Sequence, residues 1–296
     1  MTEHKQSPTT LAAHTRDRLG EGPVWHGAEG ALYWVDIGGS RLHRFDPASR
    51  EVATRILQEP LTCLSPLRSG EGFIGAFASG LARIDRNGGV TGWIARPEAD
   101  RAGNRFNDGK SGPGGRFWAG SMNATGSGAT GALYRVEPDG SWDRVLDGIG
   151  ISNTFAWSLD GRTFYSADTA AGVIFAFDHD PDDGSIRHRR VLAGPEIAPG
   201  YPDGSALDAE GCLWNARWDG GCLVRITPDG KVDRTIPLPV RRPTSCAFGG
   251  PDLRTLYVTS AIWDYDEAAL RDQPWAGGLL AVEPGVQGAP VGIYGA

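Results

Sequence analysis

A turn followed by an apolar and aromatic run recurs six times along the chain, at intervals of 42 to 50 residues. The six segments read EGALYWVDI, EGFIGAFAS, GGRFWAGSM, DGRTFYSAD, EGCLWNARW and LRTLYVTSA. Runs of this composition between Gly and Asp turns are typical of β-strands. A sequence period of about 20 to 50 residues indicates a repeat architecture, so it constrains the fold more than any other feature of this chain.

Each repeat holds more than one strand. A second Gly-led strand follows the first and enters an Asp, Pro or Gly turn, as in GALYRVEPDG and GCLVRITPDG. A third strand, such as 232–238, and a lead-in strand, such as 154–158, complete each unit. Four-stranded units at this period are the signature of a β-propeller. We therefore predict an all-β, six-bladed propeller with four antiparallel strands per blade.

Helical periodicity is absent apart from a turn near 266–271, which argues against a doubly wound or barrel fold. A propeller must close its ring, and we expect the N-terminal segment 10–16 to pair with the sheet at the C-terminal end. No internal linker is evident in the sequence, so we treat residues 1–296 as one domain, with 1–9 as a flexible tail.

Composition narrows the functional classes. The 43 glycines and 20 prolines accompany 40% hydrophobic residues and 10 tryptophans, which indicates many tight turns around a large core. A net charge of −7 disfavours nucleic-acid and anionic-membrane partners, and no stretch has the length of a signal or membrane segment. We expect a soluble, cytoplasmic protein whose four separated cysteines are reduced.

The repeat register also points to a site. Four of the six units place an oxygen-bearing side chain eight or nine residues before the Gly of the apolar strand, at Glu21, Asn107, Asn153 and Asp203. We expect the apolar run of each unit to be the innermost strand of its blade, with these side chains immediately before it. Because equivalent positions form a ring around a propeller axis, these groups should converge at one mouth of the channel. Carboxylate and carboxamide oxygens suit a hard divalent cation. Turn capping is the alternative role for such residues.

Several strings resemble the regucalcin/gluconolactonase family of six-bladed propeller lactonases. They are LGEGPVW, NRFNDGK, ISNTFAWSLDG, YPDGSALDAEGCLWNARWDGG and TSCAFGGPDLRTLYVTSA, in the order of that family. The resemblance implies a divalent metal held by Glu21, Asn153 and Asp203. It also implies substrate hydroxyl contacts from Arg105 and Asn107.

Two departures from the family pattern bear on the substrate. Thr154 stands where the family more often has Gly, and 123–125 replaces a segment in which some relatives carry a Glu that touches the sugar.

The resemblance implies hydrolysis of a sugar-acid lactone. One divalent cation, Ca²⁺, Zn²⁺, Mn²⁺ or Mg²⁺, would polarise the carbonyl while water attacks. No G-x-S-x-G or H-E-x-x-H motif offers another route. Asp203 is the candidate base, with hydroxide on the metal as the alternative. A propeller esterase or phosphotriesterase with the same metal site, and a non-catalytic calcium-binding propeller, are the rival functions. The sequence leaves open the preferred aldonolactone, the cation and the oligomeric state.

Overall fold

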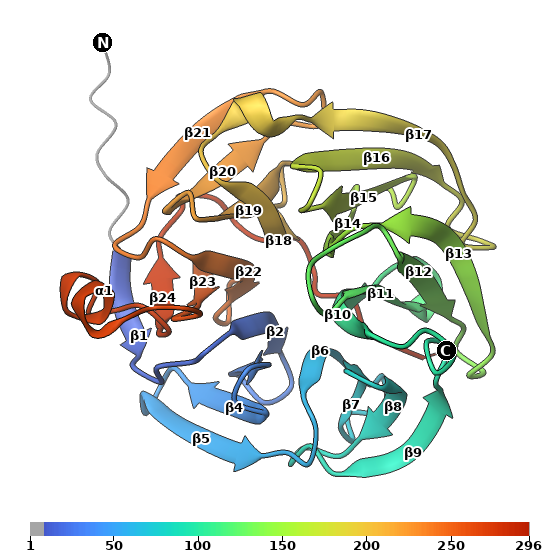
Figure 1. The fold of residues 1–296 in the computed structure, drawn as a ribbon, viewed down its shortest axis with the longest axis horizontal. Coiled ribbons are helices and arrows are strands. Elements are labelled where there is room, and N and C mark those ends of the chain that lie inside the picture. The colour runs from blue at the N-terminus through green and yellow to red at the C-terminus, as the bar shows by residue number, and fades with distance from the viewer. Residues whose placement is uncertain (1–8, 296) are drawn as a thin grey trace.

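Six β-sheets surround a central axis in the computed structural model, which describes residues 9–295. Its 24 strands form six four-stranded antiparallel sheets, each a blade of a six-bladed propeller (Figure 1). The predicted fold class and strand number per blade are confirmed. A ring of this kind brings residues from distant parts of the sequence to a common axis.

The first three blades follow the chain in order. Blade one contains β2 (Gly20–His26), β3 (Ala31–Asp36), β4 (Arg41–Asp46) and β5 (Glu51–Ile56). Blade two contains β6 (Leu61–Pro66), β7 (Phe73–Phe77), β8 (Gly80–Ile84) and β9 (Val90–Ala95). Blade three contains β10 (Asn104–Ser111), β11 (Phe117–Asn123), β12 (Gly131–Val136) and β13 (Trp142–Ile149).

Blades four and five continue this order, and blade six contains both ends of the strand sequence. Blade four contains β14 (Ser152–Trp157), β15 (Thr163–Asp168), β16 (Val173–His179) and β17 (Ile186–Ala193). Blade five contains β18 (Tyr201–Leu207), β19 (Leu213–Trp218), β20 (Cys222–Ile226) and β21 (Val232–Pro237). Blade six contains β22 (Pro243–Gly249), β23 (Thr255–Ser260), β24 (Leu279–Val282) and β1 (Thr9–Ala13).

Blade six closes the ring. Its outermost strand β1 comes from the start of the chain and pairs antiparallel with β24, from Thr9 opposite Val282 to Ala13 opposite Leu279. The predicted closure by N- and C-terminal segments is confirmed. The expected tail 1–9 lies outside the described residues except for Thr9, which is the first residue of β1.

The innermost strands differ in identity from the prediction. The strands nearest the axis in Figure 1 are β2, β6, β10, β14, β18 and β22, which are the lead-in strands of the repeat. The apolar runs that define the period form the second strand of each blade. The oxygen-bearing positions therefore lie within the innermost strands and not before them.

Apolar side chains fill the space between neighbouring blades. Tyr33 of blade one and Leu61 of blade two share one buried cluster, and Ile74 of blade two and Phe106 of blade three share the next. Complete burial of a large apolar side chain contributes about 2 kcal/mol. The four cysteines are free and buried, as expected from their spacing.

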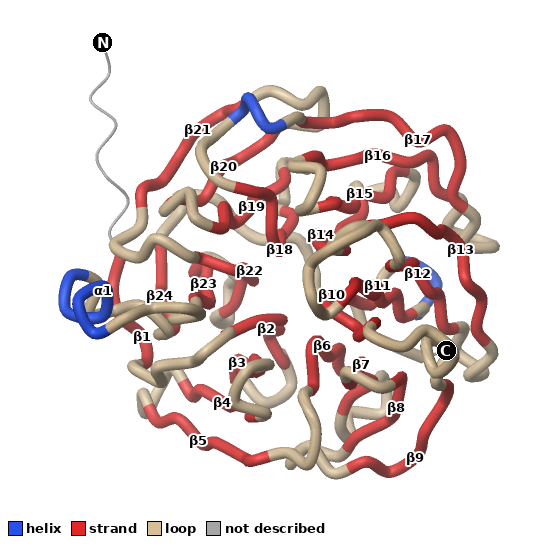
Figure 2. The backbone as a smooth tube through the Cα atoms, in the orientation of Figure 1, coloured by secondary structure: helices blue, strands red, loops and turns tan. Residues whose placement is uncertain are grey.

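The strands account for most of the described chain, and helices are short (Figure 2). Helix α1 (Glu267–Asp272) lies outside the ring, and the side chain of Asp266 caps its first turn by accepting from the Ala269 N–H. Two 3₁₀ turns, η1 (Pro113–Gly115) and η2 (Pro195–Ile197), precede second and innermost strands respectively. Within residues 9–295 no helix has the length and apolar character that a membrane crossing requires.

Residues 284–295 form a segment that we call the C-terminal strap. It leaves blade six and runs across blade five, where the Ala209 N–H donates to the Gln287 carbonyl at 2.8 Å. It ends near blades two and three, where the Tyr294 N–H donates to the Pro66 carbonyl at 2.9 Å. Figure 1 shows the C-terminus on that side of the ring. The strap therefore ties together blades that are not adjacent in sequence.

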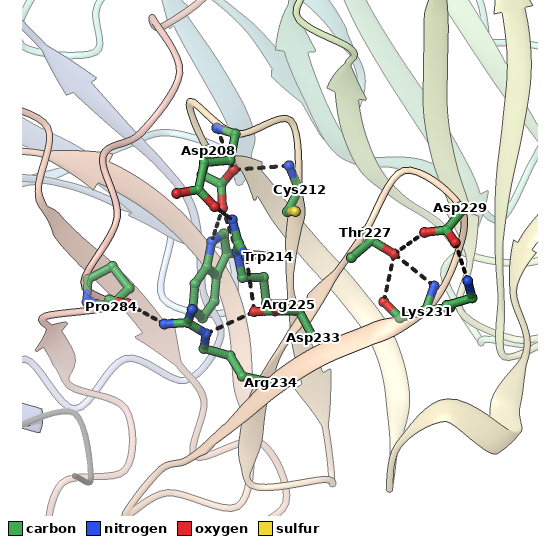
Figure 3. A network of polar contacts seen from close by, with 11 residues as sticks. Asp208, Cys212, Trp214, Arg225, Thr227, Asp229, Lys231, Asp233, Arg234 and Pro284 are labelled. Atoms are coloured by element: carbon green, nitrogen blue, oxygen red, sulfur yellow. Dashed lines mark hydrogen bonds and ion pairs between the residues drawn. The ribbon is translucent and has the colours of Figure 1, made fainter. Parts of the chain in front are cut away.

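A buried ionic network fastens blade five beneath the strap (Figure 3). The Asp208 carboxylate, which is fully buried, accepts from Trp214 Nε1 at 2.9 Å and from Arg225 Nε at 2.8 Å. Arg225 also pairs with Asp233, and Arg234 Nη1 donates to the Pro284 carbonyl at 3.0 Å. Because a buried charge is costly unless it is paired and hydrogen-bonded, these contacts fix the strap side of the blade.

Candidate metal centre

We call the end of the channel at which the innermost strands begin the acidic end. The polar side chains at this end are buried. The exposed fractions are 5% for Glu21, 2% for Asn153 and 5% for Asp203. Asn107 is 8% exposed. The strands β2, β10, β14 and β18 supply these four residues, each in the first half of the strand. The closed ring therefore brings together four residues that are far apart in the sequence.

An irregularity in each innermost strand directs these side chains. The register between the innermost and second strands shifts in all six blades, between Glu21 and Val24 in blade one and between Pro202 and Ser205 in blade five. A β-bulge re-aims side chains and is common beside functional sites. Glu21, Asn107, Asn153 and Asp203 all lie at or within these bulges, where the regular alternation of side chains is interrupted.

A glycine follows each acidic residue at these bulges, in Glu21-Gly22, Asp108-Gly109 and Asp203-Gly204. Gly22 has a φ of 53°, in the left-handed region that glycine enters most readily. A Cβ on Gly204 would lie 2.0 Å from Ser245 Oγ of the neighbouring blade. The glycines allow the backbone to bulge and the blades to approach each other at the site.

The carboxyl groups of Glu21 and Asp203 share a hydrogen bond, which brings two of the three predicted metal ligands into contact. Burial and the negative charge of Asp108 raise the pKa of Glu21 from its ordinary value of 4.5 to about 8. Burial and the charge of Glu21 raise the pKa of Asp203 well above its ordinary value. Burial and the neighbouring carboxyl groups therefore disfavour the ionised forms of both side chains.

Asp108 is a third acidic group that the sequence register did not select. It is 5% exposed and accepts hydrogen bonds from the N–H groups of Gly109 and Thr154. Burial raises its pKa to about 6, and the nearby Lys110 opposes that rise. Its signal in the sequence was the acid-Gly dipeptide, which it shares with Glu21 and Asp203.

The amide side of the site is a hydrogen-bonded chain. Arg105 Nη1 donates to Asn107 Oδ1 at 2.9 Å, and Asn107 Nδ2 donates to Asn153 Oδ1 at 3.2 Å. Asn107 Nδ2 also donates to the Ser152 carbonyl at 2.9 Å. Both hydrogens of the Asn107 amide nitrogen are thus engaged. Its oxygen already accepts from Arg105 and can accept from one further donor. Arg105 stays close enough to Glu21 to attract it electrostatically.

Thr154 has a strained backbone conformation, and its hydroxyl bonds the strand that carries Asp203. Its φ of 55° lies in the left-handed region, where a β-branched residue is unusual. Its hydroxyl donates to the Asp203 carbonyl and lies 2.9 Å from Ser205 Oγ. Asn215 Nδ2 donates to the same Asp203 carbonyl at 3.0 Å. These bonds fix the bulge that carries Asp203, and they explain how Thr is accommodated at this position.

The donor set fits a hard dication. Glu21, Asp108, Asn153 and Asp203 offer oxygen atoms only, and dications such as Ca²⁺ and Mg²⁺ prefer oxygen ligands. Across residues 9–295, no three His, Cys, Asp or Glu side chains are arranged to hold an ion on their own. An amide oxygen, that of Asn153, is therefore needed to complete such a set. A bound dication would favour the ionised forms of these carboxyls and so oppose the rise in their pKa values.

Comparison with known proteins identifies the family of this chain. A family model described as SMP-30/gluconolactonase/LRE-like region matches residues 19–262. The chain belongs to this family. The SMP-30/gluconolactonase family match begins two residues before Glu21 and includes every residue of the acidic end. The family resemblance read from the sequence strings is confirmed.

Individual members of the SMP-30/gluconolactonase family resemble the whole chain. The 6-deoxy-6-sulfogluconolactonase of Pseudomonas putida is 40% identical over 279 residues, covering 93% of this chain and 94% of that protein. Regucalcin of Xenopus laevis is 38% identical over 286 residues, covering 94% and 95%. The crystal structure of a calcium-binding protein, regucalcin, from Agrobacterium tumefaciens superposes with a TM-score of 0.90 at 30% identity, covering 98% of this chain and 97% of that one.

Proposed function

We propose that this protein is a divalent-metal-dependent lactonase that opens the lactone of a sugar acid. The observation that carries the proposal is the buried set of carboxyl and amide oxygens at the acidic end, where burial, together with the charge of neighbouring carboxyls, raises the pKa values of Glu21 and Asp203. The similarity to a 6-deoxy-6-sulfogluconolactonase supports a lactone substrate. The similarity to a regucalcin named as calcium-binding supports a divalent cation, with Ca²⁺ as the first candidate.

Glu21, Asn153 and Asp203 would hold the cation, with Asp108 close behind them. A bound dication supplies Lewis-acid polarisation of the lactone carbonyl, worth several kcal/mol in the transition state. The three ligands come from three different blades, so the position of each is set by its own bulged strand. Each ligand is carried by a different blade of a packed ring, and this preorganises the site.

Asp203 is the proposed general base. Its environment disfavours the charged form, and a carboxylate with a raised pKa is a better proton acceptor than an ordinary one. Cation binding opposes that effect by favouring the ionised form. In the proposed step Asp203 takes a proton from the attacking water and later returns it to the ring oxygen that leaves. The Thr154 hydroxyl and the Asn215 side-chain amide hold the backbone carbonyl of this residue in place.

Arg105 and Asn107 are proposed to bind the substrate hydroxyl groups. The Asn107 oxygen accepts from Arg105 and keeps one free acceptor position, whereas the Arg105 guanidinium has further N–H donors. Arg105 is thus suited to sugar oxygens, and Asn107 both orients Arg105 and touches Asn153. This chain connects substrate binding to the metal-binding residues.

The test is hydrolysis by purified protein after chelation and after return of single cations. Gluconolactone and related aldonolactones are the substrates, with an aryl ester and a phosphotriester as competitors. We expect turnover of a lactone that is lost on chelation and restored by at least one cation. Preferred turnover of the ester or phosphotriester would replace the lactonase proposal by the corresponding hydrolase.

A non-catalytic calcium-binding role is the second candidate, because one structural relative is named for calcium binding. Calorimetric titration of the chelated protein with Ca²⁺ separates it from the first. Tight binding without turnover of any of the three substrate classes would favour this role and contradict the lactonase proposal.

A further inference from the structure

The outermost strand of blade one, β5, has a free edge with which no strand pairs within residues 9–295 (Figure 1). All six residues of β5 are exposed. The exposed fraction is 36% for Val52 and 84% for Ile56, the highest value among the large apolar side chains of the described chain. An exposed edge strand with apolar side chains is a template for pairing with another chain.

The outermost strands of the other five blades have features that discourage such pairing. In β1, β9, β13, β17 and β21 the register with the neighbouring strand shifts at least once. In addition, β17 carries three arginines and β21 ends in Pro237. Bulges, prolines and charged side chains are the means by which proteins protect their sheet edges. By contrast, β5 pairs with all six residues of β4 without a register shift, so its edge is regular.

The backbone of β5 alternates between residues that bond β4 and residues whose N–H and C=O groups point away from the blade. The Leu57 N–H donates to the Ser40 carbonyl at 2.8 Å, directly beyond the last paired residues of the two strands. In an antiparallel ladder the hydrogen-bonded positions recur at every second residue, so the register assigns each residue of β5 to one side. The residues whose backbone groups point outward are Val52, Thr54 and Ile56.

The charges of β5 are complementary to those of a second copy of the same strand. In an antiparallel pair related by a twofold axis at Ala53, this small, uncharged residue faces its own copy. Glu51 of each copy then lies opposite Arg55 of the other. Opposite charges that face each other across an antiparallel pair stabilise it, and like charges in that position destabilise it. The sequence of β5 therefore favours a second copy of this chain as the occupant of the edge.

We propose that β5 is the interface of a twofold-symmetric homodimer, in which the β5 strands of two copies pair antiparallel about Ala53. Val52 of each copy exchanges backbone hydrogen bonds with Thr54 of the other, and Ile56 lies diagonal to Val52 of the second copy, which covers part of its apolar surface. Each copy has one such edge, so association ends at the dimer. Because β5 lies on the perimeter of the ring, away from the central channel, the proposal does not depend on the proposed lactonase activity.

The test is sedimentation velocity of the full-length protein at a series of concentrations. An interface that buries less than about 1,200 Å² is weak, so the series should run from about 1 to 300 µM. We expect the sedimentation coefficient to rise with concentration from that of a monomer to that of a dimer and no further. A monomer throughout the series, or growth beyond the dimer, would overturn the proposal.

Two charge variants locate the interface and its register. Glu51→Arg and Arg55→Glu each place like charges opposite each other, so either variant alone should dimerise about tenfold more weakly or worse. An equimolar mixture of the two should associate as the wild type does, because both cross-strand pairs are then opposite in charge. Arg187→Glu, at an exposed position of β17, is the matched control and should leave dimerisation unchanged.

All three substitutions are at exposed positions, so Tm should stay near that of the wild type, which shows that the variants are folded. Wild-type dimerisation of either β5 variant alone, or failure of the folded mixture to associate, would contradict pairing through β5 in this register.

Discussion

The two ends of the channel are made by the same strands yet have opposite chemistry. In β2 the first half contributes Glu21 and the second half contributes Val24 and Trp25. In β14 the first half contributes Asn153 and the second half contributes Trp157. The register shift in each strand marks the boundary between the two halves.

This division shows how a repeat protein separates function from packing. The second halves of the strands are regular, and their large side chains pack under the strap. The first halves are bulged, contain glycines or a strained Thr154, and gather negative charge. Strain and like-charge repulsion are tolerated at functional sites when the surrounding structure holds them in place. The acidic end should therefore respond to substitution through activity and metal binding, and the strap side through stability.

The largest expected effect is on catalysis at the acidic end. Asp203→Asn removes the proposed base while keeping the shape of the side chain, and kcat should fall about 10² to 10⁴-fold with a smaller change in KM. The measurement is steady-state lactone hydrolysis at saturating cation. Asp229→Asn, the same substitution at an exposed turn of blade five, is the matched control and should retain wild-type kcat. Equal rates in the two variants would remove Asp203 from the chemistry.

The strained position gives the next largest effect. Thr154→Val keeps the β-branched shape but removes the hydroxyl, so the Asp203 carbonyl loses one of its two side-chain donors. We expect Tm to fall by about 4–6 °C and cation affinity to weaken, since the lost buried hydrogen bond contributes about 1 kcal/mol and the strain of the left-handed backbone is then less well compensated. Thr154→Ser retains the hydroxyl on a less crowded side chain and should stay near wild type. A Val variant as stable and as tight for the cation as the Ser variant would show that the hydroxyl does not position Asp203.

Stability should also depend on pH through the carboxyls of the acidic end. The fold raises the pKa of Glu21 from 4.5 to about 8, so between these values the folded chain binds a proton that the unfolded chain has released. Folding stability contributed by this group is present below pH 4.5 and is lost as pH rises through about 8. In chelated protein we expect Tm, relative to Glu21→Gln, to decline by on the order of 5 °C from pH 5 to pH 8.

Cation addition should reverse this trend, because it favours the ionised carboxyl, and the Tm increase caused by Ca²⁺ should grow with pH. Thermal scans of the wild type and of Glu21→Gln, with and without Ca²⁺, provide the comparison. A difference between the two proteins that does not change with pH would contradict the raised pKa of Glu21.

The smallest effect is expected from the strap. The Tyr294 hydroxyl donates to the Glu137 carbonyl at 2.8 Å, and Tyr294→Phe removes that bond together with the contact of the hydroxyl with Arg83. One such bond contributes about 1 kcal/mol, so Tm should decrease by about 2–4 °C while kcat and cation affinity stay unchanged. A clear decrease in kcat at a temperature where the variant is still fully folded would show that the two ends of the channel are energetically coupled.

Much of the fold follows from the sequence because the repeat is periodic. Strand number, ring closure and the convergence of the innermost strands all follow from the six-unit register and from the need to avoid open sheet edges. The family strings identified Glu21, Asn153 and Asp203, and the structure brings Glu21 into contact with Asp203 and links Asn153 to Asn107. Their roles in binding a metal stay predictions.

The features that the sequence did not predict are set by single residues within a repeat and by contacts between blades. A β-bulge adds a residue to one strand, so a count of eight or nine positions selected Asn107 and missed its neighbour Asp108. The hydrogen bonds of Thr154 link blade four to blade five and leave no local pattern. The strap has no regular alternation of apolar and polar residues. Its hydrogen-bond partners lie in four blades, and each blade makes only a few backbone bonds with it.

Ring closure by β1 and β24 also affects how the chain reaches this structure. The segment Thr9–Ala13 is synthesised before every other strand of the propeller, and its partner Leu279–Val282 is synthesised after all of them. Contacts between such distant segments form slowly, because the entropy of closing a long loop is lost before the pairing can compensate for it. Until Leu279–Val282 has been synthesised, β1 has no strand to pair with, and we expect the unpaired edges of blade six to be the point at which the nascent protein is most exposed to misassembly.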